Sequence, residues 1–251
     1  MNNQFIRSEI LLGYDKIEKL KNTKVAVVGI GGVGSYVLEG LARSGIGSFI
    51  LIDDDIIAES NINRQIIALN STIGKSKVSV AKQRVLDINN CADVKTYETF
   101  YGQGKGTNII DGCDYVVDAI DTVTSKLDLI SEATNKGIPI ISCMGTGNKL
   151  NPLKLRVSDI YKTKTCPLCR VMRRELKTRG IKKLKVVYSE EQPIKPLEPH
   201  NEEEHNVHKK RKTVGSVSFV PSVAGMIICS EVVKDILDIK PEINPNCIFS
   251  K

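Results

Sequence analysis

Residues 24–64 read KVAVVGIGGVGSYVLEGLARSGIGSFILIDDDIIAESNINR, and this stretch decides the fold. The apolar run Val25–Val28 is long enough for a strand that is buried on both faces. It leads into a glycine-rich turn and then into an apolar helical pattern, an order of elements that is typical of a nucleotide-phosphate site. The glycines that we expect to lie against the phosphates are Gly29, Gly31, Gly32 and Gly34.

A second apolar run, Phe49–Ile52, ends in Asp53. A carboxylate at the carboxyl end of the neighbouring strand can accept hydrogen bonds from both ribose hydroxyls. The glycine pattern alone does not distinguish NAD, FAD and ATP. The polar segment that follows does, because the guanidinium of Arg64 can bind phosphate oxygens two at a time, whereas dinucleotide oxidoreductases have no general need for an arginine there. Asn61 and Gln65 belong to the same segment, so we expect a triphosphate site here.

Two more polar residues are expected at the same edge of the sheet. Lys77 lies in the first turn of a helix predicted over 74–88, which is the electrostatically poor end of a helix for a cation. An anionic ligand explains a lysine there, and a solvent-facing lysine is the structural alternative. Asp121 ends the strand predicted over 114–121, at the edge where open α/β sheets bind ligands. Asp118 is the alternative, as a carboxylate that merely caps a loop.

The composition sets bounds on the class of protein. The chain has 251 residues, a net charge of +7 and a hydrophobic content of 41%, which is ample for a core. The basic balance favours a polyanionic partner, and a solvated basic face is the plain alternative. The seven cysteines are scattered and odd in number, and Met1–Glu9 is polar. We therefore expect a reduced, cytoplasmic protein without a signal peptide or a membrane span.

Strands that alternate with helices predict an α/β fold, Rossmann-like and doubly wound, with a mostly parallel sheet through about residue 145. Residues 1–22 are expected to form a helical lead-in beside the sheet. Beyond the parallel part the pattern changes to a C-terminal antiparallel extension. Its predicted elements are a strand over 154–161, a basic helix over 166–179, a strand over 182–188, an exposed and mobile crossover loop over 189–214, a buried strand over 215–220 and a helix that Pro221 opens.

The succession of motifs resembles the ThiF/MoeB/ubiquitin-activating-enzyme superfamily. The matching motifs are VVGIGGVGSYVLEGLARSGIG, LIDDDIIAESNINRQ, GKSK and DAID, and they cover most of residues 5–150. Enzymes of this superfamily bind ATP with Mg²⁺, adenylate a carboxylate and are usually homodimers. The resemblance implies one ThiF-type adenylating domain over 1–251, in which 1–150 form the ATP-binding part and 151–251 form an extension on the substrate side.

The resemblance also implies roles for individual residues. Asp53 would bind the ribose, and Asp121 would hold Mg²⁺ or its water shell. Arg64, Lys77 and Asp121 would be catalytic, because neutralising charge on the phosphates is the chief task of such a site. Arg7 matches a family arginine that reaches the ATP of the partner subunit. The whole implied ATP site comprises Gly29, Gly31, Gly32, Gly34, Asp53, Asn61, Arg64, Gln65, Lys77 and Asp121.

Within the superfamily, the whole-chain layout is similar to that of the tRNA threonylcarbamoyladenosine dehydratases. The matching segments include CPLCRVMRRELKTRGIKKLKVVYSEE and the ending GSVSFVPSVAGMIICSEVVKDIL. This resemblance implies ATP-dependent dehydration of threonylcarbamoyladenosine in tRNA, a cyclisation that proceeds through carboxylate adenylation. One alternative is an adenylyltransferase that activates the C-terminus of a ubiquitin-like sulfur-carrier protein. Another is a NAD-dependent oxidoreductase or a nucleotide-sensing module, in which Arg64 and Lys77 would be idle.

The remaining expectations concern cysteines and basic residues. ThiF and MoeB relatives often carry two CxxC pairs that bind zinc, whereas this chain has only Cys166 and Cys169. Because a tetrahedral zinc site needs four ligands, we expect no structural zinc and two reduced thiols, with a metal or redox role as the alternative. Some dehydratases have a cysteine linked to sulfur transfer where this chain reads Val220-Pro221-Ser222, and this departure counts against a sulfur-relay role. Whether a sulfur-transfer or activator protein cooperates with this one is left open by the sequence. The candidates for tRNA contact are Arg170, Arg173, Arg174, Lys182, Lys183, Lys209, Lys210, Arg211 and Lys212.

Overall fold

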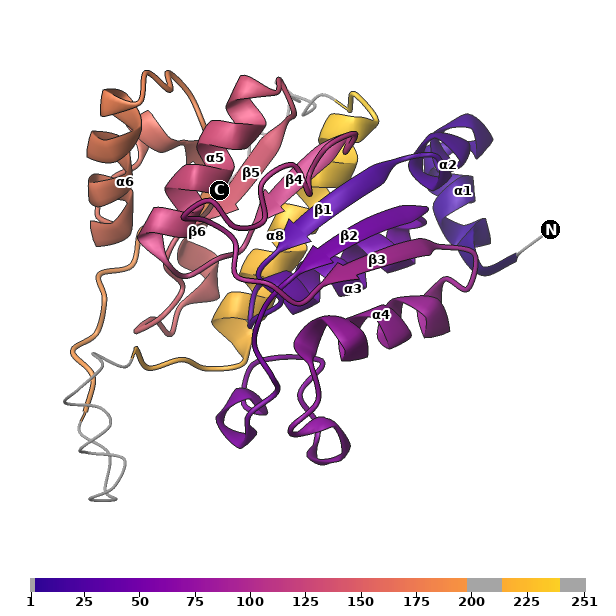
Figure 1. Cartoon of the computed structure of the whole chain (residues 1–251), viewed down its shortest axis with the longest axis horizontal. Coiled ribbons are helices and arrows are strands. Elements are labelled where there is room, and N and C mark those ends of the chain that lie inside the picture. The colour runs from indigo at the N-terminus through magenta and orange to yellow at the C-terminus, as the bar shows by residue number, and fades with distance from the viewer. Residues whose placement is uncertain (1–2, 198–213, 240–251) are drawn as a thin grey trace, which may run out of the picture.

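The computed structural model describes residues 3–197 and 214–239, and within them seven strands form one sheet in the order β3-β2-β1-β4-β5-β7-β6 (Figure 1). Neighbouring strands are parallel except β6 and β7, which pair antiparallel. The predicted Rossmann-like α/β fold with an antiparallel extension is therefore confirmed. The strands are β1 (Lys24–Val28), β2 (Ser48–Ile52), β3 (Asp93–Tyr97), β4 (Tyr115–Asp118), β5 (Ile140–Cys143), β6 (Leu155–Asp159) and β7 (Lys185–Ser189).

Helices cover both faces of the sheet. Successive residues of β1 join different cores, since Val25 and Val27 pack with α2, α3, α4 and α8 on one face and Ala26 and Val28 pack with α5 on the other. A third cluster joins α5 to α6. The α-helices are α1 (Ile6–Leu12), α2 (Tyr14–Lys21), α3 (Gly34–Ser44), α4 (Lys77–Ile88), α5 (Val123–Asn135), α6 (Pro167–Thr178) and α8 (Phe219–Ile236). The short 3₁₀ turns are η1 (Asn3–Phe5), η2 (Glu59–Asn61), η3 (Asn70–Thr72), η4 (Pro152–Lys154) and η5 (Ile160–Lys162).

The N-terminal lead-in is two helices rather than one. Gly13, with a φ of 91°, separates α1 from α2. Ile17 and Leu20 of α2 are buried in the core, whereas Ile10 and Leu11 of α1 are 80% and 84% exposed. The lead-in therefore packs on the core through Phe5 and α2, whereas α1 leaves Ile10 and Leu11 exposed.

The buried strand predicted over 215–220 is wrong. Residues 214–217 have no regular secondary structure, and α8 already begins at Phe219. Pro221 fits in the first turn of α8 because backbone N–H groups there have no partner within the helix. A short apolar run such as the one that ends at Val220 is equally typical of a buried strand and of the start of a buried helix, so its pattern does not distinguish the two.

The crossover segment is described only at its two ends. β7 ends at Ser189, and residues 190–197 and 214–217 are irregular. The rest of the predicted crossover loop lies outside the described residues, and the prediction of its mobility lies there with it. In the described ranges, no helix combines the length and the apolar character that crossing a membrane requires.

Candidate nucleotide site

The glycine turn joins the carboxyl end of β1 to the start of α3, and two of its positions admit only glycine. Gly29 has a φ of +89°, and a Cβ there would lie 2.7 Å from the carbonyl oxygen of Ala119. A Cβ on Gly34 would lie 1.8 Å from the carbonyl oxygen of Gly29. These two glycines therefore let β1, α3 and the segment after β4 approach one another closely.

The other two glycines of the turn form a cradle that is open at Gly31 and closely lined by Arg64 and Pro221 at Gly32. Nothing lies within 4 Å of a Cβ built on Gly31, and a Cβ on Gly32 would meet the Cγ of Arg64 at 3.3 Å. Among the described residues, the backbone N–H groups of Gly31 and Gly32 find no hydrogen-bond acceptor. Unpaired N–H groups just before a helix, together with the helix dipole, favour an anion such as phosphate.

Asp53, Asp55 and Lys77 form a charged group beside the turn. Asp53 follows β2, and its carboxylate accepts hydrogen bonds from the N–H groups of Ile30 at 2.6 Å and Asp55 at 3.0 Å. Lys77 begins α4 and is 5% exposed, and its Nζ lies 2.6 Å from Asp55 Oδ2 and 3.8 Å from Asp53 Oδ1. Burial raises the pKa of the Asp53 carboxyl, and the charge of Lys77 and the two N–H bonds oppose that rise. A nearly buried cation thus lies close to a carboxylate that could bind a ribose.

Arg64 lies against the turn at Gly32, in the segment between β2 and α4. Its side chain is half-buried and packs on Gly32. Its Nη1 donates to the carbonyl oxygen of Ser60 at 2.7 Å and to Asn63 Oδ1 at 2.9 Å. The stem of Arg64 is therefore held at the cradle and its guanidinium at two neutral acceptors, neither of which balances its charge.

Asn61 and Gln65 support this segment. Asn61 Oδ1 accepts from the N–H of Ala58 at 3.2 Å, and its carbonyl oxygen accepts from the N–H groups of Arg64 and Gln65. Gln65 is buried, and its Oε1 has no hydrogen-bond partner within the described ranges. A buried polar atom without a partner is rare in proteins and points to a ligand or water that completes the site.

Asp121 lies in the segment between β4 and α5, which packs on Gly29 through Ala119. Its side chain is exposed and accepts one long hydrogen bond, from Thr122 Oγ1 at 3.3 Å. The carboxylate is therefore solvated and could bind a cation. All of these groups lie on segments that come after the carboxyl ends of β1, β2 and β4, namely the cradle, Asp53 with Asp55 and Lys77, Arg64, and Asp121.

Asp118 does more than cap a loop. It accepts from the N–H of Ile120 at 3.2 Å, as a cap would. It is also fully buried, accepts two hydrogen bonds from Lys126 Nζ at 3.0 Å each, and accepts another from Ser142 Oγ. This buried ion pair ties β4, β5 and α5 together beneath the segment that carries Asp121.

The basic candidates for RNA contact divide into three groups. The exposed ones on and after α6 are Arg170, Arg174, Lys182 and Lys183. Arg173 differs, because it is half-buried and donates to the carbonyl oxygen of Thr163 at 3.0 Å, so it supports the local structure. The four at Lys209, Lys210, Arg211 and Lys212 lie outside the described residues.

Cys166 and Cys169 stand at the start of α6, where both are buried and neither forms a disulfide. A hydrogen bond from the Cys169 thiol and the N–H groups of the first helical turn lower the pKa of Cys166 to about 6, against the effect of burial. In the residues that the structure describes, the one group of three or more metal-type side chains close enough to share an ion is Asp53, Asp54 and Asp55. The absence of structural zinc stays a prediction.

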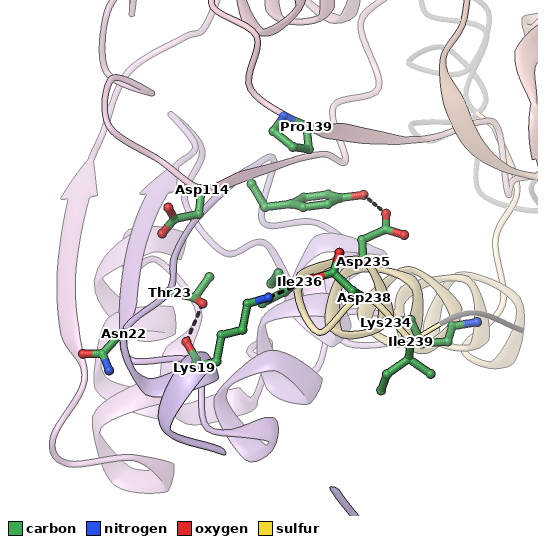
Figure 2. A pocket seen from close by; sticks show the side chains of 11 residues that line it. Lys19, Asn22, Thr23, Asp114, Pro139, Lys234, Asp235, Ile236, Asp238 and Ile239 are labelled. Atoms are coloured by element: carbon green, nitrogen blue, oxygen red, sulfur yellow. Dashed lines mark hydrogen bonds and ion pairs between the residues drawn. The ribbon is translucent and has the colours of Figure 1, made fainter. Parts of the chain in front are cut away.

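A cavity of about 820 Å³ lies at the opposite edge of the sheet, under the amino ends of β1 and β4 (Figure 2). Its polar side chains have partners within the protein. The Tyr115 hydroxyl donates to Asp235 Oδ2 at 2.6 Å, and Lys19 Nζ lies 3.0 Å from Asp238 Oδ2. Arg7 belongs to α1, which also lies beside this amino edge (Figure 1).

Three residues of interest were not predicted from the sequence. Asp55 is the nearest acid to Lys77, and the acidic run 53–55 was the available signal. Lys126 is a fully buried cation that pairs with Asp118. The two residues lie eight positions apart on different elements, so no sequence pattern indicated that they meet. Asn63 is the neighbour that accepts from Arg64, and it was visible in the same polar segment.

Comparison with known proteins tests the resemblance directly. Residues 3–250 match the ThiF family. The chain belongs to the ThiF family. It is 43% identical over 243 residues to a Bacillus subtilis protein named tRNA threonylcarbamoyladenosine dehydratase, and the match covers 94% of this chain and 96% of that relative. The family resemblance inferred from the motifs is therefore confirmed.

Two further relatives bear on the chemistry of this ThiF-family protein. The solved structure of Escherichia coli tRNA N6-threonylcarbamoyladenosine dehydratase, TcdA, in complex with ATP has a TM-score of 0.83 and 30% identity, and the match covers 94% of each chain. A Vanderwaltozyma polyspora protein named adenylyltransferase and sulfurtransferase UBA4 is 37% identical over 131 residues, which cover 52% of this chain and 30% of that relative. The likeness to the dehydratases spans nearly the whole chain, and the likeness to the adenylyltransferase spans half of it.

Proposed function

We propose that this protein is an ATP-dependent tRNA threonylcarbamoyladenosine dehydratase. The observation that carries the proposal is the meeting of the open cradle, Arg64 and the Lys77–Asp53 pair at one edge of the sheet. That site lies in a chain that is similar over 94% of its length to a relative of this name, and the E. coli relative was solved with ATP. The tRNA supplies the substrate carboxylate, and ATP activates it.

In the first step, an oxygen of the threonylcarbamoyl carboxylate attacks the α-phosphorus of ATP, and pyrophosphate leaves. We assign the cradle N–H groups of Gly31 and Gly32 to the phosphates and Asp53 to the ribose. Arg64 and Lys77 neutralise the charge that develops on the phosphates during attack. The enzyme thus positions two anions, ATP and the substrate carboxylate, and stabilises the negative charge that develops on the phosphates.

In the second step, the carbamoyl group of the same substrate attacks the activated acyl carbon. A five-membered ring closes, and AMP leaves with the oxygen that the carboxylate contributed. Ring closure within one molecule has a high effective molarity, so the step needs no covalent nucleophile from the protein. The net change to the nucleoside is the loss of one water.

Asp121 is the residue that we assign to Mg²⁺. Its exposed, weakly bonded carboxylate is a hard oxygen donor of the kind that this ion prefers, and Mg²⁺ commonly uses one or two carboxylates together with substrate phosphates. The ion would supply charge neutralisation to the polyphosphate. Asp118 does not fit this role, since Lys126 and Ser142 already occupy its oxygens.

We also propose a homodimer in which Arg7 reaches the ATP of the partner subunit. Arg7 lies on the short helix α1, at the edge of the sheet away from its own cradle. Ile10 and Leu11 on the same helix are 80% and 84% exposed, which supports a partner surface there. The exposed basic residues on and after α6 are the proposed contact for the tRNA backbone, and the cytoplasm is the proposed compartment.

The decisive experiment follows oxygen atoms through the reaction. Modified tRNA whose threonylcarbamoyl carboxylate carries heavy oxygen is incubated with enzyme, ATP and Mg²⁺, and the products are measured by mass spectrometry. We expect the nucleoside to lose one water and the label to appear in AMP. Unchanged nucleoside would refute the proposal. Label in inorganic phosphate would show that the carboxylate is phosphorylated rather than adenylated.

The alternative, activation of a sulfur-carrier protein, shares the same ATP site and finds its support in the likeness over 131 residues to the UBA4-named protein. The same incubation tests it when a carrier protein replaces the tRNA. An acyl-adenylate on the carrier, with no change in the nucleoside of the tRNA, would favour this alternative. The longer likeness to the dehydratases supports the tRNA reaction.

A further inference from the structure

Asn63 connects the nucleotide site to the far end of the crossover segment. Its Oδ1 accepts from Arg64 Nη1 at 2.9 Å, and its Nδ2 donates to the carbonyl oxygen of Ser216 at 3.0 Å. Both groups of one side-chain amide are therefore used, one on each side. The bridge spans 153 residues of sequence and joins the segment that carries Arg64 to the chain just before α8.

Asn148 holds the two described arms of the crossover segment together. Its N–H donates to the carbonyl oxygen of Gly215 at 2.7 Å, and its Oδ1 accepts from the N–H of Gly215 at 2.8 Å. Its carbonyl oxygen accepts from the N–H of Ile194 at 2.8 Å. Asn148 has a φ of 56°, a left-handed conformation that asparagine tolerates better than most residues.

The packing around Asn148 leaves little freedom. A Cβ on Gly147 would lie 2.1 Å from Val214 Cγ1, so the second arm lies directly on the segment after β5. The carboxylate of Glu191 accepts from the N–H groups of Leu150 and Asn151, at 3.0 and 2.9 Å, which fixes the first arm beside it. Asn148 is thus hydrogen-bonded to Gly215, and Gly215 precedes Ser216 in the chain, so the three residues form one connected support.

We infer that Asn63 and Asn148 are positioning residues, which act in series to hold the Arg64 guanidinium where it binds the phosphates of ATP. Asn148 fixes Gly215, Gly215 places the carbonyl of Ser216, and that carbonyl orients the amide that holds Arg64. The inference rests on the proposed role of Arg64 in ATP binding. If the inference holds, ATP binding depends on the two described ends of the crossover segment, residues 190–197 and 214–217. If Asn63 and Asn148 merely stabilised their own loops, changing them would leave ATP binding unaffected.

The physical basis is the conformational entropy of a long side chain. A free arginine loses rotamer freedom when it binds phosphate, and a side chain that is already held loses less. Losing one or two hydrogen bonds that position it should weaken ATP binding by about tenfold. Because the lost interactions restrict Arg64 before and during catalysis alike, the KM for ATP should rise while kcat stays close to that of the wild type.

The test is a double-mutant cycle on the full-length protein, read by the Kd for ATP without tRNA. Asn63→Ala removes the bridge, and Asn148→Gly removes one side-chain bond while keeping a residue that adopts positive φ. Each variant should bind ATP more weakly, by about tenfold and about threefold respectively, with the melting temperature monitored in parallel. In the Asn63→Ala background, Asn148→Gly should have no further effect.

The control is Asn108→Gly, which changes another asparagine of positive φ, at 65°, in a loop between β3 and β4. It should leave the Kd for ATP unchanged. Equal effects of Asn148→Gly in the two backgrounds, or wild-type affinity in Asn63→Ala, would overturn the inference. If both variants behave as expected but the wild type does not dehydrate modified tRNA, the proposed function fails and the positioning of Arg64 stands.

Discussion

The two edges of the sheet differ in how their polar groups are satisfied. At the amino edge, a cavity of about 820 Å³ is lined by polar side chains that have partners within the protein, such as Tyr115 with Asp235 (Figure 2). At the carboxyl edge, the N–H groups of Gly31 and Gly32 and the Oε1 of Gln65 have no partner among the described residues. The cavity therefore has few polar atoms left for a ligand, whereas the unpaired atoms around the glycine turn are available to one.

The largest expected effect comes from Gly34. A Cβ there would lie 1.8 Å from a backbone oxygen, so Gly34→Ala must displace the turn or the start of α3. We expect a loss of about 3 kcal/mol in the free energy of unfolding, measured by chemical denaturation. Wild-type stability in this variant would show that the turn is not packed as described.

Gly31→Ala separates binding from folding. Nothing lies within 4 Å of its added Cβ, so the free energy of unfolding should change by no more than about 0.5 kcal/mol. The methyl group would project into the open cradle, and we expect the Kd for ATP to rise by at least about tenfold, measured by calorimetry. Unaltered ATP affinity would mean that phosphate does not approach this side of the turn.

At the amino edge we expect the opposite result, a loss of stability with unchanged ATP binding. Asp235→Ala removes the acceptor of the Tyr115 hydroxyl and the partner of Lys185, whose Nζ lies 2.6 Å from Asp235. It should cost about 1–3 kcal/mol of stability and leave the Kd for ATP unchanged. Asp238→Ala is the control, because its pair with Lys19 is solvent-exposed and should be worth less than about 1 kcal/mol. Loss of ATP binding in Asp235→Ala would contradict the separation of the two edges.

The smallest effect concerns the pH dependence of Cys166. Its pKa is lowered to about 6 by the Cys169 thiol and the N–H groups at the start of α6, so it is a thiolate above that pH. We expect the pH profile of alkylation at Cys166, resolved by mass spectrometry, to have its midpoint below that of an ordinary thiol. Cys169→Ala removes the thiol donor and should move this midpoint upward. A midpoint at the ordinary thiol value in the wild type would refute this assignment.

The parallel part of the fold could be predicted because its signals are local. Val25–Val28, the glycines and Asp53 follow one another within one βαβ unit, so a strand, a turn and a carboxylate could be placed without knowledge of distant contacts. Arg64 and Lys77 lie on the connection after this unit, and the structure places Arg64 against Gly32 and Lys77 beside Asp53.

The rest depended on contacts between distant segments. The run before Pro221 was assigned to a strand because its apolar residues do not reveal the helix that they begin. The burial of Asp118 with Lys126 depends on how α5 packs over β4, and the bond from Asn63 to Ser216 joins segments 153 residues apart. Charge pairing and long-range hydrogen bonds leave no period in a sequence, so neither could be read from it.

ATP–pyrophosphate exchange with Arg64→Ala decides whether the carboxyl edge of the sheet activates a tRNA-bound carboxylate with ATP. Exchange is measured with modified tRNA, with a sulfur-carrier protein and with neither, and the melting temperature of each protein is recorded. We predict exchange by the wild type only with modified tRNA, and its loss in an Arg64→Ala variant that remains folded. Exchange that persists in the folded variant would show that Arg64 is not needed for adenylation, and exchange that requires the carrier protein would show that tRNA is not the substrate.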